Sequence, residues 1–535
     1  MTHGTWGTSA ALRQLLQELV SWESVTLSEG ERLFPVKLKK KLQELLYFQK
    51  HPHLLALHDV DVGRKFLTAL YKHPDAKQTI CLISHFDTVH TEEYGELQEY
   101  AIKPEELMKR LAKRKGDLPF DAWQDLLSSD YLFGRGTMDM KMGLAIHLHL
   151  LEKATLENWQ INLLLVTVPD EEVNSSGMRC AVPKLLELRE EHELEYILFL
   201  NSEPVFTQNP NDYRYYFYTG TIGKLLPAVL FYGKETHAGE PLRGMTSAYM
   251  SSYLTKEMEW NRAFQETSFT EKTPLPVTLK QVDLLSEYST QTPYRSYALY
   301  NVFLMEQDPA EVFDRFEQTA KIAAAKLNRE YKEICRLHQA EPIGEVKVIR
   351  YEQLLTYTEK KHGKKFVRSV KEAVQSHGDW DEREKSIRIA DQLMISCQEL
   401  SPAMVIMLAP PYYPAVNSSG HQRIEHIVRL VTKLAKKKFN LSMERIHYFN
   451  GLCDLSYVSY KGSQKEQDLF AKNMPVWNDS YTIPFAEMKK LDAPVLNIGP
   501  FGKDPHKRTE RLHMENAFEQ VPVILEEMIR MLREK

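Results

Sequence analysis

The sequence lacks any long hydrophobic run. No stretch approaches the roughly 20 consecutive apolar residues that a membrane-spanning helix requires. The first residues (MTHGTWGTSAALRQLLQELVSW) also lack the basic segment, long apolar core and small-residue cleavage site of a signal peptide. These absences argue against a membrane partner and against export, so we expect a cytoplasmic protein.

Cysteine is scarce and charge is nearly balanced. Five cysteines are spread over 535 residues, mostly in apolar surroundings, which is typical of reduced, buried thiols rather than of a disulfide framework. The net charge of −5 at pH 7 offers no general field for a polyanion, so we expect no nucleic-acid partner. Internal repeats, low-complexity tracts and flexible linkers are also missing.

Three buried-looking apolar runs are followed closely by acids or a histidine. TICLIS at 79–84 precedes His85, INLLLVTV at 161–168 precedes three consecutive acids, and YILFL at 196–200 comes shortly before another acid. Continuous apolar runs of this length are typical of parallel strands buried on both faces. Since the carboxyl ends of parallel strands meet at one edge of the sheet, the sequence predicts an α/β domain with functional side chains at that edge.

The pattern changes at about residue 215. Aromatic-rich alternating stretches and two helical stretches follow in a β-α-β-β-α-β order, which is typical of an α+β sandwich. The α/β pattern then resumes, and the first expected strand of this last part is at 403–410. The sequence therefore predicts a mostly parallel-sheet catalytic domain, residues 1–214 and 352–535, interrupted by an inserted α+β lid or dimerisation domain at 215–351.

His85 and Asp87 directly follow the run at 79–84. Residues two apart in an extended segment point the same way, so Asp87 could hydrogen-bond the His85 imidazole and fix which ring nitrogen faces a metal. Taken alone, an H-x-D pair is better explained by a capping or salt-bridge role.

Two further acidic motifs follow. Asp139 comes after the glycine-flanked turn at 134–136 and leads a helical pattern, where the helix macrodipole alone would favour an acid. Asp170, Glu171 and Glu172 are harder to explain without cations, because three consecutive carboxylates at the end of an apolar strand repel one another. Neighbouring carboxylates also allow one to bind a metal while the other serves as a proton shuttle.

Three more candidate side chains lie farther along the chain. Glu203 follows the expected strand at 196–200, and His506 lies in a loop after a strand expected at 494–499. His237 belongs to the inserted domain, so it can reach the others only if the domains close or if another subunit approaches. A lone surface histidine is the alternative interpretation of His237.

Together these motifs resemble those of the M20 family of metal-dependent peptidases and amidohydrolases. In chain order the likeness is carried by SHFDTVH, GRGTMDMKMG, PDEEVNSSG, NSEP, THAGEP and PHKRTERL, and it covers nearly the whole chain. Within that family the chain resembles the arginine-utilisation branch of the Roc type, through PDEEVN, GTIGKLLP, GKETHAGE, MLAPPYYP and NIGPFGKDPHKRTER.

The resemblance implies two divalent metal ions and a role for each position. Two groups of ligands with one shared carboxylate would hold the ions: His85, Asp139 and Glu203; and Asp139, Glu172 and His506. Glu171 would be the general base, and Asp87 would orient His85. His237 would stabilise the tetrahedral oxyanion, often across a dimer in this family. Histidine and carboxylate ligands suit Zn²⁺, with Co²⁺ or Mn²⁺ as substitutes.

The sequence departs from the family pattern at several points. Met142 stands where the family usually has a second glycine after DMK, and a charged, mostly helical filler at 92–128 occupies a stretch that is usually shorter. His513 is a rival to His506 for the last ligand. We favour His506 because its H-x-x-x-E spacing to Glu510 matches the family.

We therefore expect a hydrolase that cleaves a peptide or N-acyl amino acid amide bond with a two-metal-activated water, acting on a small substrate. A homodimer formed through the inserted domain by strand addition is expected with it. The alternatives are a non-catalytic binding protein that retains the fold, and a two-metal hydrolase of another ester or amide. Every metal-binding position is present, which argues against the first. No arginine or lysine cluster follows the strand ends, which weighs against phosphoester cleavage.

Overall fold

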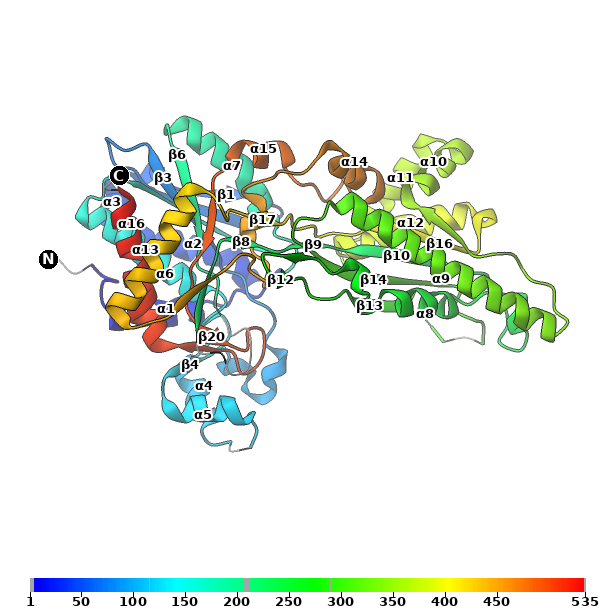
Figure 1. Ribbon diagram of the computed structural model, residues 1–535, viewed down its shortest axis with the longest axis horizontal. Coiled ribbons are helices and arrows are strands. Elements are labelled where there is room, and N and C mark those ends of the chain that lie inside the picture. Colours follow the sequence, from blue (N-terminus) through cyan, green and yellow to red (C-terminus); the bar gives the residue numbers. More distant parts are fainter. Residues whose placement is uncertain are drawn as a thin grey trace. The chain divides into compact units, whose positions relative to one another are not determined.

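The chain folds into two units in a computed structural model (Figure 1). The structure describes residues 4–114, 116–205, 212, 214–285, 287–288 and 290–533. The first unit comprises Met1–Thr221, Val416–Tyr460 and Pro484–Lys535, and the second comprises Ile222–Ala415 and Lys461–Ile483. Each unit has its own central sheet.

The first unit is built on an eight-stranded sheet. In spatial order its strands are β1 (Leu55–Asp59), β2 (Lys65–Tyr71), β5 (Asn162–Val168), β3 (Gln78–His85), β6 (Glu195–Asn201), β19 (Val495–Asn497), β7 (Tyr215–Tyr218) and β18 (Met443–Ile446). The central strands β5, β3, β6 and β19 are parallel, whereas β1, β2 and β5 pair antiparallel. The predicted mostly parallel sheet is therefore confirmed.

Helices cover both faces of this sheet. The chain runs from β3 to β5 in one direction and from β5 to β6 in the other, so right-handed crossovers place the intervening helices on opposite faces. One face carries α6 (Lys141–Glu157) with α1 (Ser9–Ser21), α13 (Gln422–Phe439) and α16 (Val521–Arg533); the other carries α7 (Ser176–Glu191) with α15 (Phe485–Leu491). Helix α2 (Glu29–Leu42) packs against β1 and β2. The short α3 (Leu46–Lys50) follows α2. Helix α6 is buried nearly all round because α1 and α16 cover it.

A helical subdomain lies beside the main sheet in the first unit, low in the view of Figure 1. It consists of α4 (Pro104–Leu111) and α5 (Phe120–Ser128), packed near a small sheet of β4 (Tyr131–Phe133), β20 (Gly502–Lys503) and β21 (Arg511–His513). This subdomain is the stretch that the sequence marked as helical filler at 92–128. A two-stranded ladder, β8 (Gly220–Thr221) with β17 (Val416–Asn417), completes the unit.

The second unit is built on a six-stranded sheet. Its strands are β13 (Val277–Asp283), β14 (Arg295–Leu304), β10 (Pro227–Tyr232), β16 (Ala403–Leu408) and β15 (Lys347–Arg350), with β9 (Gly223–Leu225) paired to β14. Helices α8 (Ser247–Met258), α9 (Pro309–Leu337), α10 (Tyr351–His362), α11 (Lys364–Gln375), α12 (Glu382–Ser396) and α14 (Gln464–Asn473) pack around it, and β11 (Thr267–Ser268) pairs with β12 (Glu271–Lys272). A separate sheet inserted into the first unit was predicted.

The extent of this insertion differs from the sequence expectation of 215–351. Strand β16 was expected in the first domain, but it pairs with β10 and β15 in the second sheet. The unit runs on to Ala415 and takes in Lys461–Ile483. All six residues of β16 are buried, and a fully apolar strand has the same sequence pattern in either of two helix-covered sheets.

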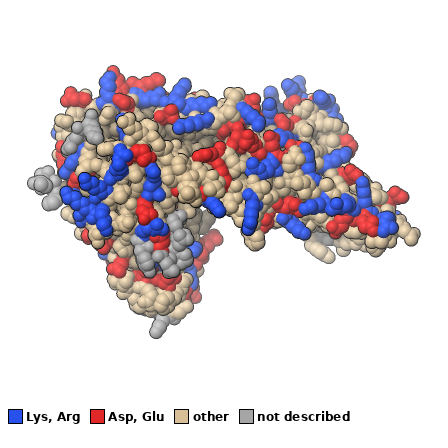
Figure 2. Space-filling model, in the orientation of Figure 1, with Lys and Arg blue, Asp and Glu red and all other residues tan. Residues whose placement is uncertain are grey.

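Charged side chains of both signs lie at the surface, and the cysteines form no disulfide among the described residues. Figure 2 shows acidic and basic side chains interspersed over the face in view. Among the described residues, no helix combines the length and apolar character needed to cross a membrane. The five cysteines are free thiols, and all but the half-buried Cys180 are buried.

Candidate metal centre

Three parallel strands deliver the candidate side chains to one edge of the main sheet. His85 is the last residue of β3, and its neighbours β5 and β6 end at Val168 and Asn201. The loops after them carry Glu171, Glu172 and Glu203. Asp139 precedes the first residue of α6, and His506 lies in the loop between β20 and β21.

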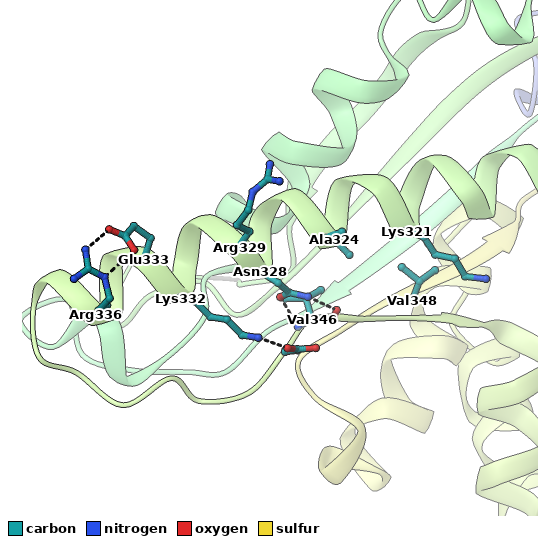
Figure 3. Close-up of a pocket in the computed structure, with 11 residues that line it drawn as sticks. Lys321, Ala324, Asn328, Arg329, Lys332, Glu333, Arg336, Val346 and Val348 are labelled. Atoms are coloured by element: carbon teal, nitrogen blue, oxygen red, sulfur yellow. Dashed lines mark hydrogen bonds and ion pairs between the residues drawn. The ribbon is translucent and has the colours of Figure 1, made fainter.

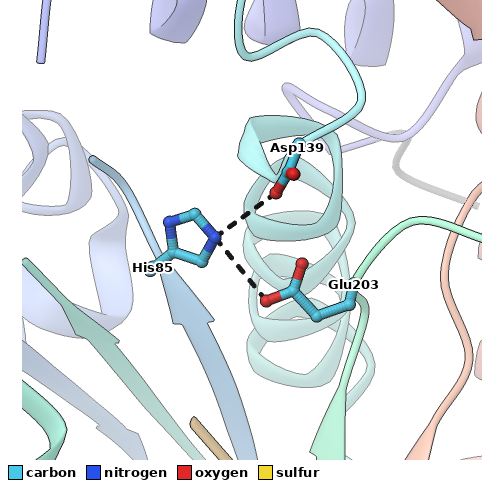
Figure 4. Close-up of side chains that lie close together, drawn as sticks. All are labelled: His85, Asp139 and Glu203. Atoms are coloured by element: carbon cyan, nitrogen blue, oxygen red, sulfur yellow. Dashed lines mark ion pairs between the residues drawn. The ribbon is translucent and has the colours of Figure 1, made fainter. Parts of the chain in front are cut away.

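One group contains His85, Asp139 and Glu203, whose ligand atoms all lie within 4.8 Å of one another (Figure 4). The Nε2 atom of His85 is 3.5 Å from Oδ1 of Asp139 and 3.6 Å from Oε1 of Glu203. Its Nδ1 atom lies 3.1 Å from the backbone carbonyl oxygen of Asp87. A carbonyl only accepts, so Nδ1 carries a proton and Nε2 of the neutral ring is left bare toward the two carboxylates.

The second group contains Asp139, Glu172 and His506. The Nε2 atom of His506 is 3.0 Å from Oδ2 of Asp139 and 3.1 Å from Oε2 of Glu172. Asp139 thus turns one oxygen toward each histidine. His513, the rival candidate, lies outside both groups found among the described residues; its ring packs edge-on against Tyr131 at 5.1 Å.

Glu171 belongs to neither group, although its Oε2 atom is 3.8 Å from Nε2 of His85. Its main chain is held by Asp87, whose Oδ1 accepts from the Glu171 amide at 3.1 Å and whose Oδ2 accepts from the Glu172 amide at 3.3 Å. Thr26 also donates to Asp87, at 2.9 Å. The buried carboxylate of Asp87 therefore supports the loop of the two glutamates. It orients His85 mainly through its carbonyl, since its Oδ1 is 3.5 Å from Nδ1.

The electrostatics show that the cluster has a deficit of positive charge. Burial, reinforced by neighbouring carboxylates, raises the pKa of Glu171 and of Glu203 well above the usual range. Burial opposes the charged form of His506, but Asp139 and Glu172 outweigh it and raise its pKa to about 11. At Asp139, burial would raise the pKa, but the contacts with His506 and His85 outweigh it and lower the pKa. A positive charge is therefore favoured between Asp139 and Glu172, which is what a bound cation would also supply.

The buried donor atoms of the two groups are suited to metal ions. The Nε2 atom of His85 is buried without a hydrogen-bond partner among the described residues and faces three carboxylates. A buried nitrogen lone pair surrounded by anions is unfavourable unless a proton or a metal ion satisfies it. The imidazole and carboxylate donors of both groups are those that Zn²⁺ and similar ions bind, so the residues fit two divalent ions.

Other groups at the site were not identified from sequence. Asp454, after β18, is 1% exposed; burial raises its pKa to about 7, and it interacts electrostatically with His85, Glu171 and Glu203. Its only signal in the sequence is its place shortly after RIHYFNG at 445–451, a stretch with a strand-like pattern.

A second overlooked group ties two motifs together. The guanidinium of Arg135, in the GRG turn, pairs with the Glu510 carboxylate at 2.5 Å and donates to the His506 carbonyl at 3.1 Å. The sequence pattern points to the two glycines of this turn, but it is Arg135 between them that contacts Glu510 and His506.

His237 lies in the second unit and is exposed. Its Nδ1 atom accepts from the Gly239 amide at 3.0 Å. In the neutral ring the proton is therefore on Nε2, which makes that nitrogen a hydrogen-bond donor.

A surface cavity of about 800 Å³ lies along α9 and β15 of the second unit (Figure 3). Lys332 pairs with Glu345 and Arg336 with Glu333 beside it. The metal-binding groups found in the described part of the chain lie elsewhere, in the first unit. This cavity is therefore not the candidate centre.

Comparison with known proteins agrees with this geometry. Residues 81–436 match the family model described as Peptidase family M20/M25/M40. The uncharacterized protein YqjN of Bacillus subtilis (strain 168) is 40% identical over 526 residues, covering 97% of this chain and 96% of that protein. Protein RocB of the same strain is 28% identical over 530 residues, covering 96% and 93%.

Two solved structures share the fold over most of their length. The M20 family metallo-carboxypeptidase Sso-CP2 from Sulfolobus solfataricus has a TM-score of 0.58 at 13% identity, covering 98% of this chain and 99% of that one. The dipeptidase Dug1p from Saccharomyces cerevisiae has a TM-score of 0.55 at 10% identity, covering 98% and 96%. Because the family model matches more than half of the chain, and a relative is 40% identical over nearly all of it, the chain belongs to peptidase family M20/M25/M40, a family of metal-dependent hydrolases.

Proposed function

We propose that this protein hydrolyses the amide bond of a small peptide or an N-acyl amino acid, with two divalent ions held at the strand ends. The observation that carries the proposal is the pair of three-residue groups that share Asp139, with one of its oxygens toward each histidine. The carboxypeptidase and the dipeptidase with the same fold support an amide substrate.

Five side chains would hold the ions: His85, Asp139, Glu203, Glu172 and His506. Divalent ions there supply Lewis-acid polarisation of the substrate carbonyl and increase the acidity of the attacking water. Zn²⁺ is our proposal for the ion, with Co²⁺ or Mn²⁺ able to replace it. The backbone just after β19 passes close to Glu203 because residue 499 is glycine: a Cβ at Gly499 would collide with the Glu203 carbonyl oxygen.

Glu171 would be the general base. It lies beside His85 but outside both ligand groups, so its carboxylate can take a proton from water and return it to the leaving amine. Asp87 fixes the backbone from which this side chain projects. The two glutamates therefore differ in role although they are adjacent in sequence.

His237 would donate its Nε2 proton to the oxyanion that forms as the carbonyl is attacked. Its tautomer is set for donation by the Gly239 amide. This role requires the second unit of the same chain, or of a partner in a homodimer, to approach the centre.

The direct test combines metal content with substrate hydrolysis. Elemental analysis of the purified protein should give up to two divalent ions per chain, and a panel of N-acyl amino acids and dipeptides should include a cleaved member. N-acyl arginines and arginyl dipeptides belong in the panel, because the chain resembles the arginine-utilisation branch and is 28% identical to protein RocB. Two bound ions without hydrolysis of any panel member would favour a binding protein, and hydrolysis of phosphoesters alone would favour the other hydrolase class.

A further inference from the structure

The helical subdomain at 92–128 is attached to the loop that carries His506. Its core includes Leu107 and Leu126 together with Phe133 of β4 and Phe501, which precedes the loop. Strand β4 in turn pairs with β21, which follows the loop. The loop therefore leaves and rejoins a small sheet that the subdomain covers.

One buried cation joins the subdomain to the loop. The guanidinium of Arg511 is fully buried and contacts three carboxylates: Nε is 2.7 Å from Asp125, Nη2 is 2.9 Å from Asp121, and Nη1 is 2.5 Å from Asp504. Asp121 and Asp125 are on α5, whereas Asp504 is in the loop itself. Lys503 also pairs with Asp125, at 2.8 Å.

The loop needs such support because of its backbone. Asp504 and His506 both have positive φ, 58° and 63°, which residues other than glycine rarely adopt unless their surroundings hold them. Asp504 accepts from Thr509 at 2.8 Å as well as from Arg511, which closes the loop around His506. The His506 side chain is itself 49% exposed, so packing of the ring holds it only in part.

The subdomain also reaches the turn before Asp139. Arg135 pairs with Glu93 of the subdomain as well as with Glu510, and it donates to the His506 carbonyl. One arginine thus links the subdomain to two of the three segments that carry ligands of the second group, those of Asp139 and His506.

We propose that the 92–128 subdomain is a positioning element for His506, acting through Asp125 and Arg511 on the loop at 504–509. The inference rests on the proposed two-ion centre. We call the Arg511–Asp125 ion pair the clamp. Its loss should have a selective effect. The affinity for the ion held by Asp139, Glu172 and His506 should fall, whereas the affinity for the ion held by His85, Asp139 and Glu203 should not change.

Site-resolved metal affinity tests this selectivity. Asp125→Asn keeps the side-chain shape and removes the charge that faces Arg511 and Lys503. Titration of the metal-free full chain with Co²⁺, followed by absorbance and chelator competition, should show one ion bound about 10- to 100-fold more weakly, the usual scale for a residue that supports a ligand. The other ion should change by less than about threefold, and His506→Ala should weaken the same ion.

A second variant and a control keep the experiment decisive. Arg511→Met should weaken the same ion, and Arg511→Lys should restore part of the affinity because one ammonium can still pair with Asp125. The control is Lys153→Met. It removes the ion pair, 2.5 Å long, between Lys153 on α6 and Glu526 on α16, a pair that includes no residue of the loop at 504–509. Its affinities for both ions should equal those of the unsubstituted protein.

The possible results separate the two proposals. Unchanged affinity for both ions in folded Asp125→Asn and Arg511→Met proteins would overturn the positioning role while leaving the two-ion centre in place. Equal weakening of both ions with a lowered unfolding temperature would reduce the subdomain to general stabilisation, which also overturns it. A wild-type protein that binds no Co²⁺ would overturn the centre and the positioning role together.

Discussion

The carboxylate of Asp87 accepts a hydrogen bond from the backbone amide of Glu171 at 3.1 Å. The proposed general base is therefore held by its main chain, by an acid that also accepts from Glu172 and Thr26. The backbone of Glu171 is thus fixed by contacts that do not involve the side chain that would take up and return the proton.

Asp87→Asn should lower kcat by about 10- to 100-fold, as is usual for a residue that supports a catalytic group. An asparagine oxygen can accept from one amide, but its NH₂ group would face the other donor. Both metal ions should still bind, as judged by elemental analysis. Full activity in the variant would show that the two amide contacts do not matter for turnover.

Asp139→Ala should lose both ions, because both ligand groups use this carboxylate. Glu203→Gln should weaken one ion only. Dialysis followed by elemental analysis measures both results, and the exposed acid Asp130, substituted by alanine, is the matched control. Full metal content in Asp139→Ala would contradict the shared ligand.

The adjacent glutamates should give different phenotypes. Glu171→Gln should keep both ions and lose about 10²-fold or more in kcat, the usual scale for a positioned acid or base. Glu172→Gln should instead weaken the ion shared with His506. Kinetics and metal analysis on the same samples distinguish the two, and exchanged phenotypes would mean exchanged roles.

His237→Ala should lower turnover without changing folding or metal content, because the residue lies in the second unit. Mixing this variant with Glu171→Gln protein tests whether sites are shared. In a dimer that exchanges histidines, mixed dimers regain one intact site and activity returns. Proven subunit exchange without recovery would leave only approach of the two units within one chain.

The buried His147 predicts how stability depends on pH. Burial lowers its pKa to about 3, and its Nε2 atom pairs with the Ser202 hydroxyl at 3.0 Å. Above pH 6.5 the ring is neutral in both folded and unfolded chains. Below that pH only the unfolded chain binds the proton, so the free energy of unfolding falls until the folded pKa is reached.

Between pH 7 and 5.5 this one group should cost about 1.3 kcal/mol of stability. His147→Gln can still bond to Ser202 but does not titrate. Urea unfolding of both proteins, with chelator present, should show a shallower pH dependence for the variant. Identical dependence on pH would mean that His147 takes up its proton in the folded chain as readily as in the unfolded one.

The strand ends could be predicted because each combines two signals. The first signal is an apolar run, which indicates a buried strand. The second is an acid or histidine just after that run, as at His85 and Glu203, which indicates a functional side chain at the edge of the sheet. The resemblance to the family then assigned roles that single motifs could not. The structure brings the five proposed ligands into two groups, while their roles remain predictions.

The missed features depend on contacts between distant parts of the chain. Strand β16 has the same apolar pattern whichever sheet it joins, so the insertion boundary could not be located from it. Arg511 and Asp125 are separated by 386 residues, and nothing local marks either as part of a clamp. The carboxylate of Asp87 faces His85, as expected, and it also accepts from the amides of Glu171 and Glu172, contacts that no local pattern marks.

The division of the chain has a consequence for its synthesis on the ribosome. The backbone passes between the units four times, after Thr221, Ala415, Tyr460 and Ile483. The second unit can therefore be complete once Ile483 has emerged, whereas β19 and the His506 loop of the first unit are translated later. Since domains generally fold as units during translation, we expect the second unit to fold first. The sheet of the first unit and the proposed metal centre can be completed only after the segment with β19 and His506 has been made.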